Sequence, residues 1–272
     1  MKFPNYWSRA YNDSGLVVAR GWSETSSEDA HQNAERRLAR ILSALRAGHE
    51  PDEYQYVADG VICEQVIDRV FHGSDEVAVI SRNVYGSLVM NTTRMMFVDI
   101  DTPQLGMLVR LKNWLTRNKP ASPDASVTTQ FRQWQKRNPH FTLRVYRTYA
   151  GFRLIIQNRC FELVDDAALK ILAELKSDRL YRRLCQQQQC FRARLTPKPW
   201  RIGLLRPPEA FPFRNEQAAQ EVENWFKQYE EASKAYSVCQ YVETIGEGMQ
   251  HPTLSSLIAQ HDSFCCRDRP LA

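Results

Sequence analysis

The sequence contains no long hydrophobic run. None of its apolar stretches approaches the roughly 20 residues that a membrane-spanning helix needs. The first residues also lack the charged and apolar segments of a secretory signal peptide. We therefore expect a cytoplasmic protein without a membrane partner.

Zinc motifs of standard spacing are missing as well, because no two cysteines form a Cys-x-x-Cys pair. Seven cysteines is an odd number, and their spacing shows no small disulfide framework, so we expect reduced thiols. One group of residues has two open interpretations, as buried free thiols or as zinc ligands of unusual spacing. Its members are Cys185, Cys190, His251, His261, Cys265 and Cys266.

An excess of positive charge is confined to one part of the chain. Residues 144–206 contain 14 lysines and arginines against five acidic residues, a local charge of +9. The whole chain carries +5, so the remainder is at −4. Such a basic segment favours a polyanionic ligand, either a nucleotide or a nucleic acid. Solvated helix faces are the alternative for part of it.

Two aspartates lie one residue apart in an otherwise apolar segment. If the segment is a strand, Asp99 and Asp101 share one face, whereas Val98 and Ile100 face a core. Paired carboxylates favour a hard cation such as Mg²⁺ or Mn²⁺. A divalent-metal site is therefore one interpretation, and a strand that ends in an Asp-Thr-Pro turn is the other.

A second segment combines a turn with polar side chains. Gly151 permits a tight turn or the close approach of a ligand to the backbone. Thr148 and Arg153 flank this turn with a hydroxyl and a guanidinium, which can hold phosphate oxygens. A plain β-hairpin is the alternative.

Residues 190–201 form a basic run in which two prolines stiffen the backbone. Phe191 and Trp200 accompany its cations, which suits a surface that binds phosphates and bases. The expected phosphate-binding residues of this run are Arg192, Arg194, Lys198 and Arg201.

The pattern of apolar residues predicts alternating strands and helices. Strands are expected at residues 15–21, 76–80, 87–90, 97–101, 141–146, 152–156 and 201–205. Helices are expected from a Ser26 or Ser27 cap to about residue 47, and at 105–117, 129–136, 167–175, 178–184 and 216–236. Residues 118–128 are the expected linker.

The order of the motifs resembles the archaeo-eukaryotic primase superfamily. Its members carry Asp-x-Asp or Asp-x-Glu on a hydrophobic strand, then a Ser-x-His-type strand, and then a third carboxylate. Residues 97–101 and 148–154 follow this order, and the likeness covers about residues 75–205. The whole chain also resembles bacterial proteins that share the run at residues 190–201, a likeness that implies no function.

The resemblance implies an α+β fold with an RRM-like antiparallel palm sheet and flanking helices. We expect residues 1–75 to form an appended N-terminal αβ unit. Residues 76–210 would form the palm-like core with the basic loop, and residues 211–272 a C-terminal helical region packed on that core.

The resemblance further implies a primase-polymerase-type nucleotidyltransferase that acts on nucleoside triphosphates and nucleic acid. Asp99 and Asp101 would hold two Mg²⁺ or Mn²⁺ ions. Thr148 stands where the family has serine, and Arg153 stands where it has histidine. Arg153 would grip the triphosphate or form a salt bridge with the aspartates and fill the metal site. The missing histidine favours the alternative, a catalytically inactive module that binds nucleotide or nucleic acid. Four residues are open as the third carboxylate: Asp165, Asp166, Asp178 and Asp262.

Overall fold

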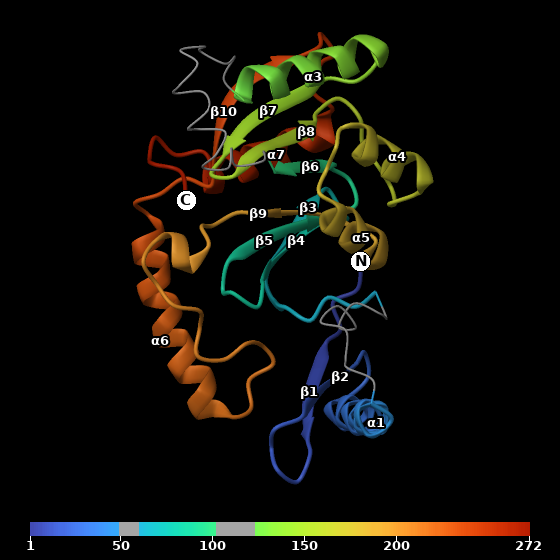
Figure 1. Cartoon of the computed structure of the whole chain (residues 1–272), viewed down its shortest axis with the longest axis vertical. Coiled ribbons are helices and arrows are strands. Elements are labelled where there is room, and N and C mark those ends of the chain that lie inside the picture. The colour runs from blue at the N-terminus through green and yellow to red at the C-terminus, as the bar shows by residue number, and fades with distance from the viewer. Residues whose placement is uncertain (49–59, 102–122) are drawn as a thin grey trace.

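The computed structural model describes residues 1–48, 60–101 and 123–272 (Figure 1). Over these ranges the chain is a mixed α+β protein with a two-stranded sheet and two four-stranded sheets. Neighbouring strands within these sheets pair antiparallel. The mixed α+β class and the antiparallel strands expected from the sequence are therefore confirmed.

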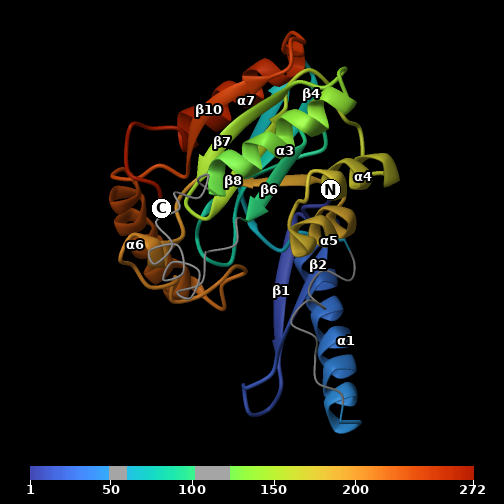
Figure 2. The same cartoon turned by 45° about the horizontal axis from the view of Figure 1, so that its top comes forward.

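The first four-stranded sheet is covered on both faces, so β8 is buried along its whole length. Helices α3 (Pro123–Arg137) and α7 (Pro252–Cys265) lie on its opposite faces (Figures 1 and 2). On the α3 face, the rings of Phe131 and Phe152 meet edge to face with centroids 5.7 Å apart. In spatial order the strands are β10 (Cys239–Ile245), β7 (Leu143–Thr148), β8 (Gly151–Ile156) and β6 (Phe97–Asp101).

The second four-stranded sheet lies beside the first, and the two share one apolar core cluster. The sheets meet where the Arg153 Nη1 of β8 donates a hydrogen bond of 3.0 Å to the Arg194 carbonyl of β9. In spatial order its strands are β3 (Gln65–His72), β4 (Asp75–Arg82), β5 (Leu88–Thr92) and β9 (Phe191–Arg194).

The N-terminal hairpin carries its own helix and its own small core. Strands β1 (Tyr6–Tyr11) and β2 (Val18–Ser23) pair, and α1 (Ser27–Arg46) lies across them. This unit extends away from the two larger sheets in both views (Figures 1 and 2). As expected, Ser26 caps α1, because its side chain accepts a hydrogen bond of 3.1 Å from the Asp29 amide.

Gly21 of β2 allows α1 to approach the hairpin. A Cβ atom at this position would lie 2.2 Å from the Ala34 nitrogen and 2.3 Å from the Ala30 carbonyl oxygen.

We expect Gly21→Ala to lower the free energy of unfolding by roughly 1–3 kcal/mol, because the helix must move off the strand. Amide hydrogen exchange across β1, β2 and α1 measures this effect. Gly15→Asn is the control, since asparagine tolerates a positive φ and a Cβ there meets nothing within 4 Å. Equal protection in both variants would contradict the prediction.

The remaining helices surround the two larger sheets. Side chains of Asp165, Asp178 and Asn215 cap the first three of them by accepting backbone hydrogen bonds. They are α4 (Asp166–Glu174), α5 (Arg179–Gln188), α6 (Glu216–Ser233) and the short 3₁₀ helix η2 (Pro199–Arg201).

Several elements match the sequence prediction, including β2, α1, β4 to β8 and α4 to α6. The strand expected at 201–205 is wrong, because Pro199 begins η2 and Gly203 takes a φ of +80°. The expected linker at 118–128 overlaps α3, which begins at Pro123. The expected helix at 105–117 lies outside the described residues. The sequence pattern does not predict β1, β3, β10 or α7.

The expected boundary at residue 75 falls at the turn between two paired strands, β3 and β4. The C-terminal region contributes the strand β10 to the first sheet in addition to α6 and α7. In the described part of the chain, no helix combines the length and the apolarity that crossing a membrane requires.

Candidate functional site

Asp99 and Asp101 lie on one face of β6, as the alternation of a strand predicts. Across the sheet, Asp99 is paired with Arg153 and Asp101 with Gly151 of β8. Asp99 is partly exposed and Asp101 is exposed, whereas Val98 on the other face is fully buried. The two carboxylates therefore mark an accessible edge of the first sheet, next to the β7–β8 turn.

Arg153 binds the Asp99 carboxylate with two hydrogen bonds. Its Nε donates to Oδ1 at 2.8 Å and its Nη2 donates to Oδ2 at 3.3 Å. The Arg153 side chain is 2% exposed and that of Asp99 is 37% exposed. Burial opposes the arginine charge, but Asp99 more than compensates and raises the pKa of Arg153 above its usual value. The Asp99 carboxylate is thus neutralised by a permanent cation rather than left free for a metal.

A buried polar chain holds Arg153 in this position. Its Nη1 lies 3.3 Å from the Nε2 of His261 on α7. The His261 Nδ1 lies 2.9 Å from Asp262 Oδ1, which also accepts a hydrogen bond of 2.8 Å from the Tyr146 hydroxyl. Arg153 is therefore fixed from both ends, by Asp99 on the sheet and by the helix behind it.

Three cations face the aspartates without a counter-charge of their own, and we call Arg194, Lys198 and Arg201 the cation group. Burial, then repulsion from Arg153 and Arg201, lowers the pKa of Arg194 to about 10. Burial, then repulsion from Arg194 and Arg201, lowers the pKa of Lys198, and Asp101 and Asp99 partly oppose this. Within the described ranges no carboxylate forms an ion pair with any member of the group.

Arg194 is the member of the cation group with an unsatisfied buried donor. Its Nε is buried and has no hydrogen-bond partner in the described structure. A buried polar atom without a partner is costly, and a buried charge without one more so. An anion bound here would provide both the acceptor and the counter-charge.

Exposed aromatic rings flank the cation group. The Arg201 guanidinium lies 4.2 Å from the ring centre of Tyr149, in the β7–β8 turn. The Lys198 ammonium lies 5.5 Å from the ring centre of Trp200. Tyr149 is 52% exposed and Trp200 is 45% exposed, so both rings remain accessible to a ligand.

The expected phosphate-binding residues thus separate into two sets. The cation group has no ion-pair partner among the described residues, whereas Arg192 and Thr148 have partners within the protein. Arg192 lies on the same face of β9 as Arg194, but its guanidinium pairs with the buried Glu64 carboxylate at 2.5 Å and with Gln188 at 2.7 Å. Its charge is thus paired with Glu64 inside the protein, although its Nε, like that of Arg194, has no hydrogen-bond partner in the described structure. Thr148 Oγ1 accepts a hydrogen bond of 3.1 Å from the Gly151 amide and so holds the β7–β8 turn.

None of the four candidate third carboxylates joins the aspartate pair. Asp165 and Asp178 cap helices, and Asp166 lies in the first turn of α4. Asp262 is bound by His261 and Tyr146. Among the described residues, no third histidine, cysteine or carboxylate groups with Asp99 and Asp101 in a metal-binding arrangement.

Sequence reasoning missed Tyr149 and Cys239 and misplaced Phe191. Phe191 is fully buried in the core, so its ring is not accessible to a ligand. Tyr149 could have been found as an aromatic residue beside the turn glycine. Cys239 comes together with His261 and Cys265, which no sequence spacing indicates.

No protein-family model, no curated protein and no solved structure matches this chain. The chemical capacity of the site therefore follows from its geometry. The three members of the cation group all have lowered pKa values, and they can bind clustered phosphate oxygens. The two exposed rings beside them, Tyr149 and Trp200, can stack on bases.

Proposed function

We propose that this chain is a catalytically inactive nucleotide- or nucleic-acid-binding module built on an RRM-like palm. The observation that carries the proposal is the cation group, in which the buried Nε of Arg194 has no hydrogen-bond partner and its guanidinium is repelled by Arg153 and Arg201. A phosphate group would relieve this repulsion, because arginine and lysine donors match its oxygens.

The surroundings of the cation group favour a nucleotide over a simple anion. Trp200 and Tyr149 are exposed next to Lys198 and Arg201, and stacking on an aromatic ring is the usual way to hold an unpaired base. Arg206 adds a further cation 5.5 Å from the centre of the Trp200 ring. Phosphate and base would thus be held side by side.

Two features favour binding over catalysis. Arg153 donates to both oxygens of Asp99, so a metal bound to the same carboxylate would be repelled by a buried guanidinium. No third carboxylate accompanies the pair within the described ranges. Two-metal nucleotidyl transfer needs oxygen ligands free to bridge the ions.

The second candidate is a metal-dependent nucleotidyltransferase of primase-polymerase type. It is favoured by Asp101, which is exposed, shares a face with Asp99 and interacts electrostatically with Lys198 and Arg201. In this case Mg²⁺ or Mn²⁺ would bind Asp101 first and draw Asp99 away from Arg153.

Binding is tested by titrating the full chain with ATP and with a single-stranded oligonucleotide while tryptophan fluorescence is recorded. We expect binding without added metal, which weakens as salt rises. Lys198→Ala should reduce affinity and lower the slope of log K against log salt by about 1 for the oligonucleotide. The control is Lys170→Ala, which removes an exposed lysine of α4 in the same basic segment. Equal affinities for the two variants would contradict the proposal.

Catalysis is tested with labelled nucleoside triphosphates, Mn²⁺ and a single-stranded template. The proposed binding module gives no extended product under any metal condition. Extended product that Asp101→Ala abolishes would instead establish the nucleotidyltransferase.

A further inference from the structure

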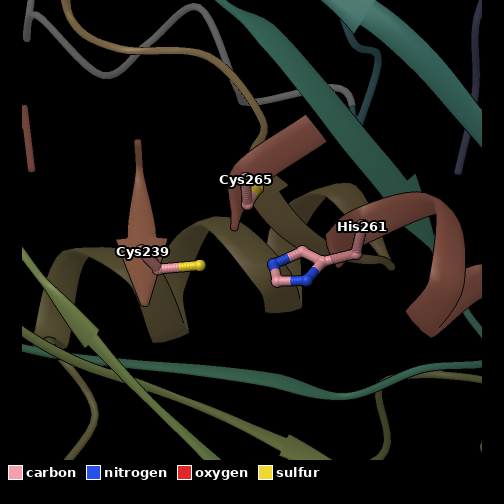
Figure 3. A group of neighbouring side chains, drawn as sticks. All are labelled: Cys239, His261 and Cys265. Atoms are coloured by element: carbon pink, nitrogen blue, oxygen red, sulfur yellow. The ribbon is translucent and has the colours of Figure 1, made fainter. Parts of the chain in front are cut away.

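Three potential metal ligands converge behind the Arg153–Asp99 pair. Cys239 begins β10, and His261 and Cys265 lie on α7. All three are buried, and their ligand atoms lie within 4.8 Å of one another. Figure 3 shows the Cys239 sulfur directed toward the imidazole ring of His261, with Cys265 beside them.

The hydrogen bonds of His261 direct its inner nitrogen toward the group of sulfurs and toward Arg153. Nδ1 lies 2.9 Å from Asp262 Oδ1, so it carries the proton and donates to the carboxylate. Nε2 then has a lone pair that accepts from Arg153 Nη1 at 3.3 Å, and a metal ion bound to Nε2 would replace this hydrogen bond. Metal-binding histidines are commonly oriented by a carboxylate in this way. Asp262 is itself held by Tyr146 at 2.8 Å.

A fourth sulfur, that of Cys266, lies beside Cys239 but not within 4.8 Å of all three ligand atoms of the group. The Sγ atoms of Cys239 and Cys266 are 3.6 Å apart. Two thiolates on one tetrahedral zinc, each about 2.3 Å from the metal, are separated by about 3.8 Å. The spacing of this pair suits a shared ion, and the Cys266 side chain would have to move toward the other two ligand atoms to complete the set.

We propose that Cys239, His261 and Cys265 bind a structural Zn²⁺ ion, with Cys266 as the fourth ligand. Thiolate and imidazole donors in a closed tetrahedral set select zinc among the common divalent metals. Each cysteine releases its proton to solvent when it binds. The three thiolates exceed the charge of the ion by one, and the Arg153 guanidinium nearby offsets that excess. The ion would fasten α7 to β10, and attraction between the guanidinium and the anionic metal centre would replace the Arg153–His261 hydrogen bond.

The zinc content of the purified full chain tests this proposal. We expect about one zinc per chain in protein prepared without chelators, and at least a tenfold loss of zinc in Cys239→Ser and Cys265→Ser. Cys185→Ser is the control, because Cys185 is buried on α5 outside the group. Cys266→Ser should release zinc to a chelator faster than the wild type, and unchanged release would remove Cys266 from the ligand set.

A measurement on the unmutated chain covers variants that fail to fold. After chelation, added Co²⁺ should produce thiolate-to-cobalt charge-transfer absorption and tetrahedral d–d bands, and added Zn²⁺ should raise the melting temperature. The absence of zinc together with no Co²⁺ bands would overturn the proposal. Recovery of the chain with a Cys239–Cys266 disulfide in place of metal would overturn it as well.

Discussion

Arg194→Met is expected to raise the melting temperature of the chain while it weakens phosphate binding. Burial, then repulsion from Arg153 and Arg201, lowers the pKa of Arg194 to about 10 in the folded state. The folded chain therefore binds this proton less tightly than the unfolded chain does, and the charge opposes folding at neutral pH. The opposition fades only as the pH rises above about 10. Methionine keeps an unbranched side chain without the charge.

The same substitution removes donors from the proposed ligand. Hydrogen bonds to charged groups contribute about 1.5–3 kcal/mol, so affinity for ATP or an oligonucleotide should fall by roughly 10- to 100-fold. Thermal denaturation and fluorescence titration measure the two effects on one preparation. A variant that melts earlier and binds as well as the wild type would refute the assignment of Arg194.

Arg192→Met provides a matched control on the same strand and face. Arg192 is paired with Glu64, whose side chain is only 9% exposed. Its removal leaves a buried carboxylate without a partner, so this variant should melt below the wild type. Opposite shifts in melting temperature at Arg192 and Arg194 would distinguish a structural arginine from a ligand-binding one.

Asp99→Ala is expected to have the largest effect on stability. It leaves the Arg153 guanidinium, 2% exposed, without its counter-charge. Breaking a buried pair by removing one partner costs about 3–5 kcal/mol. We expect a loss near 3 kcal/mol, because Asp99 itself is partly exposed, and a fall in melting temperature of about 6–12 °C. Chemical and thermal denaturation measure both quantities.

The neighbouring aspartate is the control for this loss. Asp101 is exposed at the end of β6, so Asp101→Ala should change the free energy of unfolding by less than about 0.5 kcal/mol. The double variant Asp99→Ala with Arg153→Met should recover part of the loss, since it removes the buried charge. Equal losses at Asp99 and Asp101 would show that the ion pair does not determine stability.

The parts of the site that depend on neighbours along the chain could be predicted from sequence. The shared face of Asp99 and Asp101 follows from the period of two in a strand. The presence of Gly151 predicts a turn, which the structure has just before it, although Gly151 itself begins β8 without a positive φ. That turn places Thr148 and Tyr149 beside the end of β6. Each of these inferences needs only a local rule.

The pairing partners could not be predicted in this way. Arg192 and Arg194 share a strand face and a side-chain type. They differ because Arg192 pairs with Glu64, which lies 128 residues away in the sequence. The bond between Arg153 and Asp99 depends on the register of β6 against β8. The same limit applies to Cys239 and His261, which meet only when β10 packs against α7.

The contacts of Arg153 also constrain how the chain can fold. Its hydrogen bonds reach Asp99, Arg194 and His261 across 54, 41 and 108 residues of sequence. Contacts between such distant segments form only after long loops close, so this guanidinium keeps its hydration shell until the sheets and α7 assemble around it. Closure then dehydrates a charge together with its partners in one cooperative step. We therefore expect the contact between the two sheets at Arg153 to form late in folding, because it needs residues from both sheets and from α7.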